Sequence, residues 1–407
     1  MSASASDATV QKVGHQEPAD ETACLEVSVV MPCLNEADTL GACIEKAQRA
    51  LSAHHIKGEI IVADNGSTDG SPVIAARLGV HVVHVKAKGY GNAMMGGIAA
   101  ARGQFIIMAD ADDSYDFHDI PRFVDKLRQG VDLVQGCRLP SGGGTVLPSA
   151  MPFLHRWWGN PMFSHMTRWM FHAPIHDVNC GMRGFTKALY DHLDLRCAGM
   201  EFANEMIIKA SLFGAKIGEV PITLHPDGRT SHAPHLKTFR DGWRTLRFYL
   251  MYSPRWLFLI PGALLILLGV VGYGIAMPGM TIGGVNFDVH TLLFSSLAIL
   301  CGYQSIHFAI FTKAFAINEG LMPGDPRLTR FFALINLERG LLIASAALLT
   351  GLALLLAAVN QWRVVNFGDL DYTQTMRLVI PGVTLTALGF QTVLSSFFAS
   401  ILGMHRR

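Results

Sequence analysis

The stretch QFIIMADADD, residues 104–113, decides the fold class of this chain. Its apolar run 105–108 predicts a short strand buried on both faces, and acidic side chains follow that strand directly. Asp110 and Asp112 stand one residue apart, so both carboxylates can face one site at the strand end. Carboxylate oxygens together with substrate phosphates are a common way of holding Mg²⁺, and Mn²⁺ would suit the same site. A helix-capping role explains one acid here, but not two acids this close to the strand.

The same arrangement recurs upstream, where predicted strands at 27–31, 59–63 and 81–85 each end in a polar run. These runs are PCLNE at 32–36, DNGSTDG at 64–70 and KGYGNA at 88–93. Helices are predicted at 36–51, 72–78, 92–102 and 117–129, and a further strand at 131–135. Strands that alternate with helices indicate a parallel sheet, in which ligands bind at the carboxyl ends of the strands. A turn explains any single run, but four runs at one sheet edge favour a ligand site.

The charge of the chain is distributed unevenly between its two parts. Only 16% of the residues are charged, against about 25% in a typical globular protein. The first 254 residues carry 24 Lys and Arg and 26 Asp and Glu, whereas the last 153 carry only 9 and 6. This distribution excludes a wholly soluble protein, a disordered chain and a binder of nucleic acid through bulk positive charge.

The charge-poor part holds four uncharged apolar runs, each at least 20 residues long. They occupy residues 256–277, 291–312, 340–359 and 378–404. Twenty helical residues extend about 30 Å, which is enough to cross the hydrocarbon core of a bilayer. The chain therefore divides into a disordered tail (1–24), a sheet domain (25–228), a basic juxtamembrane segment (229–255) and a four-helix transmembrane domain (256–407).

The orientation of the spans follows from the charges of the connecting loops. Loop 277–290 has no Lys or Arg, whereas loop 313–339 has four. The positive-inside rule then places the second loop, both termini and the sheet domain in the cytoplasm. We expect a multi-pass protein of the cell membrane.

The juxtamembrane segment predicts an amphipathic helix with two stripes. Lys237, Arg240, Arg244 and Arg247 form one stripe, and Phe239, Trp243, Leu246 and Leu250 form the other. Such a helix lies in the membrane interface, with aromatic side chains in the lipid and cations toward anionic headgroups. Nonspecific adhesion to the bilayer and a specific grip on a lipid phosphate both fit this pattern.

Taken together, the runs 27–40, 64–71, 88–103 and 110–113 resemble family 2 glycosyltransferases of the GT-A fold. The resemblance covers about residues 25–250. Within the family, the chain is most similar to dolichyl-phosphate mannose synthases and bacterial polyprenyl-phosphate glycosyltransferases. It implies a Rossmann-like α/β domain with a mostly parallel sheet, followed by the all-α transmembrane domain. It also implies that a sugar passes from a nucleotide-sugar to dolichyl or undecaprenyl phosphate, with Mg²⁺ or Mn²⁺ bound. A lipid monophosphate is mostly a dianion at pH 7 and can attack directly, so we expect inversion at the anomeric carbon.

The resemblance also implies roles for individual residues. The nucleotide-sugar would be bound by Pro32, Leu34, Glu36, Asp64, Asn65, Asp110, Ala111, Asp112, Arg138 and Arg229. Asp110 and Asp112 would hold the metal and, with Arg138, act in catalysis. From the resemblance, Arg138 and Arg229 would contact phosphates, with Lys237 a further candidate. From the charge pattern of the juxtamembrane segment, Arg229, Lys237, Arg240, Arg244 and Arg247 are the candidates for binding the lipid phosphate. The sequence departs from the family at Leu34, where Tyr is usual, at Ser114, where Gln is frequent, and at 231–237, which replaces a Gly-Glu-Ser-Lys stretch.

Other interpretations remain open at this point. Glu201 and Glu205 could serve a hydroxyl acceptor as a base, although helix-surface or sugar-hydroxyl contacts fit them better. A processive polysaccharide synthase typically has a Gln-x-x-Arg-Trp motif, which is absent here. A nucleotide-sugar sensor without catalysis is another alternative, whereas a flippase should carry charges within its spans. The donor sugar and its base are not specified, and a homo-oligomer is left open.

Overall fold

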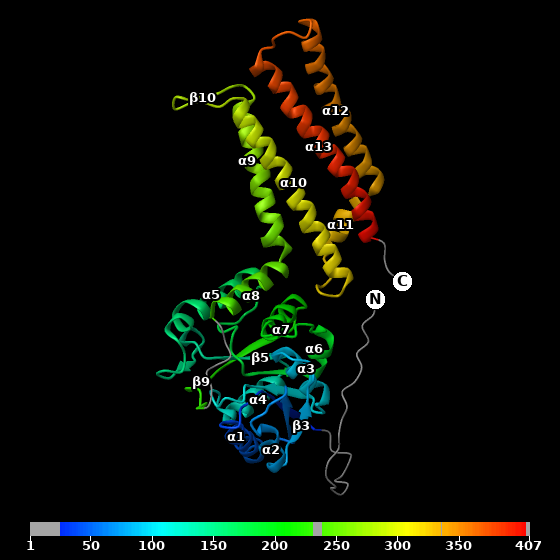
Figure 1. Cartoon of the computed structure of the whole chain (residues 1–407). Coiled ribbons are helices and arrows are strands. Elements are labelled where there is room, and N and C mark those ends of the chain that lie inside the picture. The colour runs from blue at the N-terminus through cyan, green and yellow to red at the C-terminus, as the bar shows by residue number, and fades with distance from the viewer. Residues whose placement is uncertain (1–24, 231–237, 335, 404–407) are drawn as a thin grey trace. The chain divides into compact units, whose positions relative to one another are not determined.

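The computed structural model of the chain describes residues 25–230, 238–334 and 336–403 (Figure 1). The chain forms two compact units, one that extends to Tyr249 and one that begins at Leu250. The predicted tail 1–24 and Lys237 lie outside the described residues. The first unit continues beyond residue 228, where we placed the end of the sheet domain.

The first unit is built on a seven-stranded sheet with the order β3-β2-β1-β4-β7-β5-β8. Its strands are β1 (Val27–Cys33), β2 (Gly58–Asp64), β3 (His81–His84), β4 (Phe105–Met108), β5 (Leu133–Cys137), β7 (Arg183–Thr186) and β8 (Ile217–Pro221). Six strands run in one direction, and β7 is antiparallel to both of its neighbours, β4 and β5. The mostly parallel sheet is therefore confirmed, and β7 is an element that the sequence pattern did not reveal.

Helices cover both faces of the sheet. The helices up to the end of this unit are α1 (Leu40–Ala53), α2 (Ser71–Arg77), α3 (Tyr90–Ala100), α4 (Ile120–Arg128), α5 (Asn160–Phe171), α6 (Lys187–Leu193), α7 (Glu201–Leu212) and α8 (Thr238–Met251), and of these α5 and α8 pack on each other. Side chains alternate along β1, so Val29 packs in the core that includes α1 and α4, while Val30 faces α3. A Cβ atom at Gly97 of α3 would lie 2.5 Å from Val30, so glycine allows this helix to pack closely on the sheet.

Helix α1 begins at Leu40, four residues later than the predicted start. Asn35 has φ +61°, a left-handed conformation that interrupts any helix at this point. The backbone N–H groups of Asn35 and Glu36 donate to Ser67 Oγ and Ser71 Oγ, each at 3.0 Å. These residues therefore tie the end of β1 to the segment after β2. Leu40 N–H donates to Glu36 O at 2.9 Å, so residues 36–39 form a turn that leads into α1.

The second unit contains four helices that are long and apolar enough to cross a membrane, as predicted. They are η4 with α9 (Arg255–Ala276), α10 (Val289–Asn318), α12 (Leu337–Val364) and α13 (Tyr372–Gly403); short elements are β10 (Thr281–Ile282), β11 (Val285–Asn286) and α11 (Pro326–Leu334). Helices α9 and α10 pack through Gly262 and Gly302, where a Cβ on either glycine would meet the other's carbonyl oxygen at 2.8 or 2.6 Å. Small residues at such contacts allow close helix packing in a bilayer.

Candidate active site at the carboxyl edge of the sheet

The loop after β1 and the segment before α8 meet through an ion pair between distant residues. Arg229 Nε donates to Glu36 Oε2 at 2.7 Å, and Nη2 donates to Glu36 Oε1 at 2.6 Å. The same Nη2 lies 3.4 Å from Asp112 Oδ2, and Nη1 donates to Asp227 Oδ2 at 2.8 Å. Burial of Arg229 would lower its pKa, but Glu36 and Asp112 outweigh that effect and raise the pKa. The structure therefore brings together three residues that we predicted for one site.

Backbone hydrogen bonds hold Arg229 in this position. His225 N–H donates to Ser114 O at 2.9 Å, and Gly228 N–H donates to Asp112 O at 3.0 Å. Thr230 donates from its N–H and from its hydroxyl to Asp38 Oδ2, both at 3.0 Å. The segment 225–230 thus lies along the acidic loop that follows β4.

The two acids of that loop have different surroundings. Asp112 Oδ1 accepts from the N–H and the hydroxyl of Ser114, at 3.1 and 2.6 Å, so Ser114 orients this carboxylate. Burial, and after it the charge of Asp112, raises the pKa of Asp110. A divalent cation bound between two neighbouring carboxylates removes their mutual repulsion, so this arrangement favours cation binding.

The donor set fits a cation that also binds substrate oxygens. Among the described residues, no group of three or more His, Cys, Asp or Glu side chains is arranged to hold a metal ion. Mg²⁺ is usually bound through one or two carboxylates plus substrate phosphates, so the pair Asp110 and Asp112 agrees with that type of site. Ser114 contacts Asp112, and it occupies the position at which we noted the missing Gln.

Asp64 and Asn65, which we predicted to bind base or ribose, have internal partners. Asp64 accepts from Ser67 N–H at 3.0 Å and from His84 Nδ1 at 3.1 Å, with the His84 tautomer assigned accordingly. The Asn65 amide donates to the carbonyl oxygens of Val85 and Ala87, and Asn65 Oδ1 accepts from Gly89 N–H at 2.9 Å. Asn65 thus shapes the loop after β3, and its contact with a nucleotide remains a prediction.

Arg138, which we predicted to contact phosphate, has an internal acidic partner, and its contact with phosphate stays a prediction. It is 7% exposed and forms a two-pronged pair with the fully buried Asp177, with Nε to Oδ2 at 2.7 Å and Nη2 to Oδ1 at 2.9 Å. Nη1 lies 3.4 Å from the hydroxyl of Tyr115, which also accepts from Gly181 N–H at 2.8 Å. Asp177 is 39 residues away in sequence, so no local pattern revealed it as the partner.

The remaining nucleotide candidates lie beside these groups in the chain. Pro32 and Leu34 flank Cys33 at the end of β1 and are partly buried, while Ala111 is buried between the two acids. Thr39 Oγ1 donates to Ala111 O at 2.6 Å, which joins the start of α1 to the acidic loop. These positions share the carboxyl edge of β1 and β4 with Glu36 and Asp112.

Glu205, for which we considered a base, a helix-surface acid and a sugar-hydroxyl contact, is a buried residue with internal partners. It is fully buried and lies 3.1 Å from Lys209 Nζ, which is also fully buried. Its Oε2 accepts from Cys197 N–H at 2.8 Å and from Arg196 N–H at 3.0 Å. The interpretation of Glu205 as a helix-surface acid is therefore wrong, because its carboxylate is buried among internal partners.

Helix α8 exposes the described cations of one predicted stripe and the two aromatic side chains of the other, whereas Leu246 and Leu250 are half-buried. A third set of residues anchors the helix. Phe239 and Trp243 are 85% and 61% exposed, and the cations Arg240, Arg244 and Arg247 are exposed as well. The buried side chain of Tyr249 packs edge-on against the rings of Phe163 and Phe171 of α5. The Tyr249 hydroxyl lies 2.6 Å from Thr167 Oγ1 and donates to Asn204 Oδ1 at 3.2 Å.

A second aromatic surface precedes and includes α5. Its large exposed side chains are Phe153, Leu154, Trp157, Trp158, Met162 and Trp169. Arg156 lies over the ring of Trp157, 5.6 Å from its centroid. Exposed aromatic groups in this number are unusual for a surface that faces water alone.

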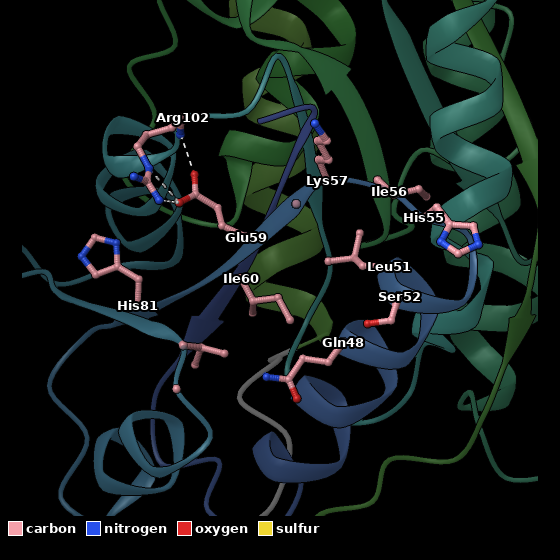
Figure 2. Close-up of a pocket in the computed structure, with 13 residues that line it drawn as sticks. Gln48, Leu51, Ser52, His55, Ile56, Lys57, Glu59, Ile60, His81 and Arg102 are labelled. Carbon is pink, nitrogen blue, oxygen red and sulfur yellow. Dashed lines mark hydrogen bonds and ion pairs between the residues drawn. The ribbon is translucent and has the colours of Figure 1, made fainter. Parts of the chain in front are cut away.

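A hollow at the opposite edge of the sheet is separate from these groups (Figure 2). It lies at the amino ends of β2 and β3 and includes Gln48, Lys57, Glu59, His81 and Arg102. Figure 2 shows Arg102 directed at Glu59, whose Oε2 accepts from Arg102 Nη2 at 2.8 Å. None of the predicted site residues lines this hollow, so the candidate active site is at the carboxyl edge.

A mostly parallel sheet with paired acids at its carboxyl edge, on a chain that also has four apolar helices, defines a membrane-bound GT-A glycosyltransferase. The chain matches the family described as glycosyl transferase family 2 over residues 28–194. It also matches the glycosyltransferase family 2 C-terminal transmembrane region over residues 310–403. The chain belongs to glycosyltransferase family 2, and it is a membrane protein.

The chain is similar to several named proteins, one over nearly its whole length and two over about half of it. It is 38% identical over 393 residues to the low-salt glycan biosynthesis hexosyltransferase Agl6 of Haloferax volcanii, covering 95% of this chain and 91% of that protein. It is 29% identical to a dolichyl-phosphate hexose transferase of the same organism, covering 48% of this chain and 82% of the relative. It is 28% identical to a dodecaprenyl-phosphate galacturonate synthase of Rhizobium johnstonii, covering 51% and 61%.

The comparison with solved structures finds two synthases, each about 20% identical to this chain. Glucosyl-3-phosphoglycerate synthase of Mycobacterium tuberculosis, solved with Mn²⁺ and UDP, is 21% identical with a TM-score of 0.43, covering 55% of this chain and 80% of that one. Mannosyl-3-phosphoglycerate synthase of Rubrobacter xylanophilus is 20% identical with a TM-score of 0.45, covering 55% and 72%.

Proposed function

We propose that this glycosyltransferase transfers a sugar from a nucleotide-sugar to a polyprenyl phosphate at the cytoplasmic face of the membrane. The observation that carries the proposal is the joining of Glu36, Asp112 and Arg229 at one sheet edge, on a chain with four apolar helices. Two relatives are named for dolichyl-phosphate and dodecaprenyl-phosphate sugar transfer, which supports a lipid phosphate acceptor.

The donor would lie at the carboxyl ends of β1, β2 and β4. Asp110 and Asp112 would hold Mg²⁺ or Mn²⁺, which neutralises the charge of the departing diphosphate. Arg229 already lies beside Asp112, so its guanidinium is near enough to share a diphosphate with that carboxylate. Pro32, Leu34, Glu36, Asp64, Asn65 and Ala111 would line the nucleotide.

Arg138 would act from a fixed position. Asp177 holds two of its nitrogen atoms, and Nη1 lies toward Tyr115 in the site. A guanidinium held in this way loses little freedom when it meets a phosphate, so its electrostatic effect on the transition state is greater. We therefore keep Arg138 as a candidate phosphate contact and add Asp177 as the residue that orients it.

The reaction needs no general base for this acceptor. The second pKa of a phosphate monoester is about 6, so the acceptor is mostly a dianion at pH 7. Its oxygen forms the new bond to the anomeric carbon while the bond to the leaving diphosphate breaks on the opposite side. A single displacement of this kind inverts the anomeric configuration. The internal contacts of Glu205 agree with a reaction that uses no helix carboxylate as base.

The acceptor would approach from the bilayer along α8. Arg240, Arg244 and Arg247 would meet the lipid phosphate or anionic headgroups, and Phe239 and Trp243 would enter the interface. The aromatic surface around Trp157 and Trp158 offers a further interfacial contact from the same unit. Lys237, which we assigned to the same stripe, lies outside the described residues.

The proposed orientation rests on the loop charges. Arg377, one of two cations in the third loop, pairs with Asp288 at 3.0 Å. This pair joins the third loop to the first. The third loop carries only two cations, Arg363 and Arg377, whereas the second loop carries four. The second loop and the termini therefore keep the stronger positive bias, which favours the cytoplasm for them.

The decisive experiment is a transfer assay in membranes. Membranes that contain the protein are incubated with a panel of radiolabelled nucleotide-sugars and a polyprenyl phosphate. We expect label from one donor in the organic phase, and none with Asp112→Asn. Label in a water-soluble polymer would favour a processive synthase, and donor binding without any product would favour a sensor.

A further inference from the structure

Gly181 lies two residues before β7, at a position for which the sequence predicted no role. A Cβ atom on Gly181 would lie 2.4 Å from Asp110 Oδ2, and 3.1 Å from both the ring and the hydroxyl of Tyr115. A real Cβ atom essentially never comes closer than 3.0 Å to another residue, so the Asp110 carboxylate lies directly against the Gly181 backbone. Gly181 is not among the residues with positive φ. The close approach, and not an unusual backbone conformation, therefore requires glycine here.

Tyr115 holds the Gly181 backbone in this place. Gly181 N–H donates to the Tyr115 hydroxyl at 2.8 Å, and Arg138 Nη1 lies 3.4 Å from the same oxygen. Tyr115 is buried, and its backbone pairs with Leu224 in an isolated antiparallel bridge. A hydroxyl oxygen has two acceptor lone pairs, so Tyr115 can accept from both donors at once. Tyr115 is therefore a fixed link between Gly181 and Arg138.

The backbone before Gly181 is bonded to β5. Gln135 of β5 is fully buried and donates from Nε2 to Asp177 O and to Cys180 O, both at 3.0 Å. One amide group thus fixes both ends of the segment 177–180, which leads directly to Gly181. Buried side-chain hydrogen bonds are strong in the low dielectric of the interior and make a segment rigid. Gly181 can therefore move away from Asp110 only if these bonds break.

The two acids after β4 are thus oriented by different means. Asp112 accepts hydrogen bonds from Ser114, whereas Asp110 Oδ2 meets the fixed backbone of Gly181. A carboxylate that meets a fixed backbone on one side cannot turn toward that side, so the contact limits the positions of both carboxylate oxygens. Groups that orient a metal ligand from outside typically contribute about 10- to 100-fold to metal affinity.

We infer that Gly181 is a positioning residue that fixes the Asp110 carboxylate for the divalent cation, and that the Tyr115 hydroxyl holds Gly181 against that carboxylate. The inference rests on the proposed function, because it takes Asp110 as a metal ligand. It predicts that a methyl group added at residue 181 weakens metal binding before any donor or acceptor is present.

The test is a Mn²⁺ titration of the full chain in detergent without nucleotide, in which electron paramagnetic resonance measures the free Mn²⁺. Gly181→Ala adds a methyl group that must displace Asp110 or Tyr115, so it should raise the Kd for Mn²⁺ by about 10-fold or more. Gly41→Ala in α1 is the matched control, because a Cβ atom there would lie in ordinary contact, 3.6 Å from Ile74 Cγ2. The control should change the Kd by less than about twofold.

Tyr115→Phe is a second variant, which adds no atoms. It removes the hydroxyl that holds Gly181, so the Kd for Mn²⁺ should again rise about 10-fold. Excess Mn²⁺ should restore the kcat of Gly181→Ala, because the added methyl group weakens metal binding and leaves the rest of the site in place. A kcat that excess Mn²⁺ does not restore would indicate a general loss of structure and contradict the positioning role.

The possible outcomes separate the inference from the proposed function. If Gly181→Ala melts cooperatively and keeps the wild-type Kd, or if it fails to fold and Tyr115→Phe keeps the wild-type Kd, the inference is overturned. The proposed function then stands if Asp112→Asn loses Mn²⁺ binding. A raised Kd for Gly181→Ala with an unchanged Kd for Tyr115→Phe would refute the role of Tyr115 and keep that of Gly181. If the wild-type protein binds no Mn²⁺, or if Asp112→Asn binds it equally well, the proposed metal site fails and the inference fails with it.

Discussion

Arg229 and Glu36 are 193 positions apart in sequence and form a two-pronged ion pair at 2.6 and 2.7 Å. The pair closes the candidate site, since it links the loop after β1 to the segment that follows β9 (Thr223–Leu224). Asp112 shares the same guanidinium nitrogen as Glu36. A change at one of these residues should therefore alter the effect of a change at another.

A double-mutant cycle tests this coupling. Glu36→Gln and Arg229→Gln should each lower kcat/KM for the nucleotide-sugar. The loss of transition-state stabilisation in the double variant should be smaller than the sum of the losses in the two single variants. We expect a coupling energy of about 0.5–3 kcal/mol, as for residues in direct contact. The exposed pair Arg122 and Asp119 is the control and should show a coupling of about 0–1 kcal/mol. Additive effects at Glu36 and Arg229 would contradict the shared role.

Turnover should depend on a divalent cation held by Asp110 and Asp112. Asp112→Asn keeps the shape of the side chain but removes its charge, so we expect at least about a 100-fold loss of kcat/KM. Asp119→Asn, at an acid outside the site, should remain within about twofold of wild type. Excess EDTA should stop the reaction, and added Mg²⁺ or Mn²⁺ should restore it. Full activity in EDTA would refute the metal-dependent mechanism.

The proposed topology can be mapped with reporters. A reporter fused after Arg407 should respond as cytoplasmic, because the second loop and the tail carry the positive bias. A reporter inserted in the hairpin at Gly283–Gly284 should respond as being on the far side; both residues have positive φ in an exposed turn. The opposite pattern would reverse the orientation of all four spans.

Charge reversal on α8 should weaken the use of the acceptor. Each Lys or Arg near an anionic membrane surface contributes about 1 kcal/mol, so Arg244→Glu with Arg247→Glu should raise the apparent KM for polyprenyl phosphate at least about 10-fold. The donor KM should stay unchanged. Arg77→Glu with Lys86→Glu is the matched control, since both residues are exposed on the same unit.

An assay in detergent with a short-chain acceptor separates the two roles of this stripe. Membrane adhesion no longer matters under these conditions. A defect that persists there indicates a specific grip on the phosphate, whereas full recovery indicates adhesion to the bilayer only.

Asp64 should make the stability of the protein depend on pH. Burial would raise the pKa of Asp64, but hydrogen bonds from Ser67, His84 and Gly66 outweigh burial and lower the pKa. The ionised form therefore stabilises the folded state at pH values above the unfolded pKa of about 3.9, and this stabilisation is lost as the pH falls through the lower folded pKa. Asp64→Asn should lower the melting temperature at pH 7, and the difference from wild type should shrink as the pH falls below about 4.

The exposed Asp191 provides the control for this measurement. Asp191→Asn should leave the melting temperature close to that of wild type at both pH values. If the difference in melting temperature between Asp64→Asn and wild type stays constant with pH, the charge of Asp64 does not stabilise the fold.

Local sequence patterns predicted the parts of this fold that depend on short-range order. The strand at 105–108 matches β4 (Phe105–Met108), and the apolar runs match four long helices. Strand β7 was not predicted because it is only four residues long and contains Arg183 and Gly184. Its place between β4 and β5 depends on tertiary pairing that no local period encodes.

In the candidate site, too, local sequence patterns predicted some features, whereas others depend on contacts between distant residues. Asp110 and Asp112 follow a buried strand, so their position could be read from the sequence. The role of Asn65 in shaping the loop up to Gly89 could not, because it depends on hydrogen bonds across 20 to 24 residues. Likewise, the pairing of Arg138 with Asp177 depends on how β5 and a distant loop approach each other.

The packing of Tyr249 against α5 determines where the chain should be truncated to obtain the catalytic unit in water-soluble form. A fragment that ends at residue 228, the predicted end of the sheet domain, would lack the Tyr249 ring that packs on Phe163 and Phe171. It would also lose the hydroxyl that bonds to Thr167 and Asn204. Such a fragment would expose the surface of α5 on which α8 packs, and it would tend to aggregate. A soluble fragment should therefore extend to Met251, where α8 ends.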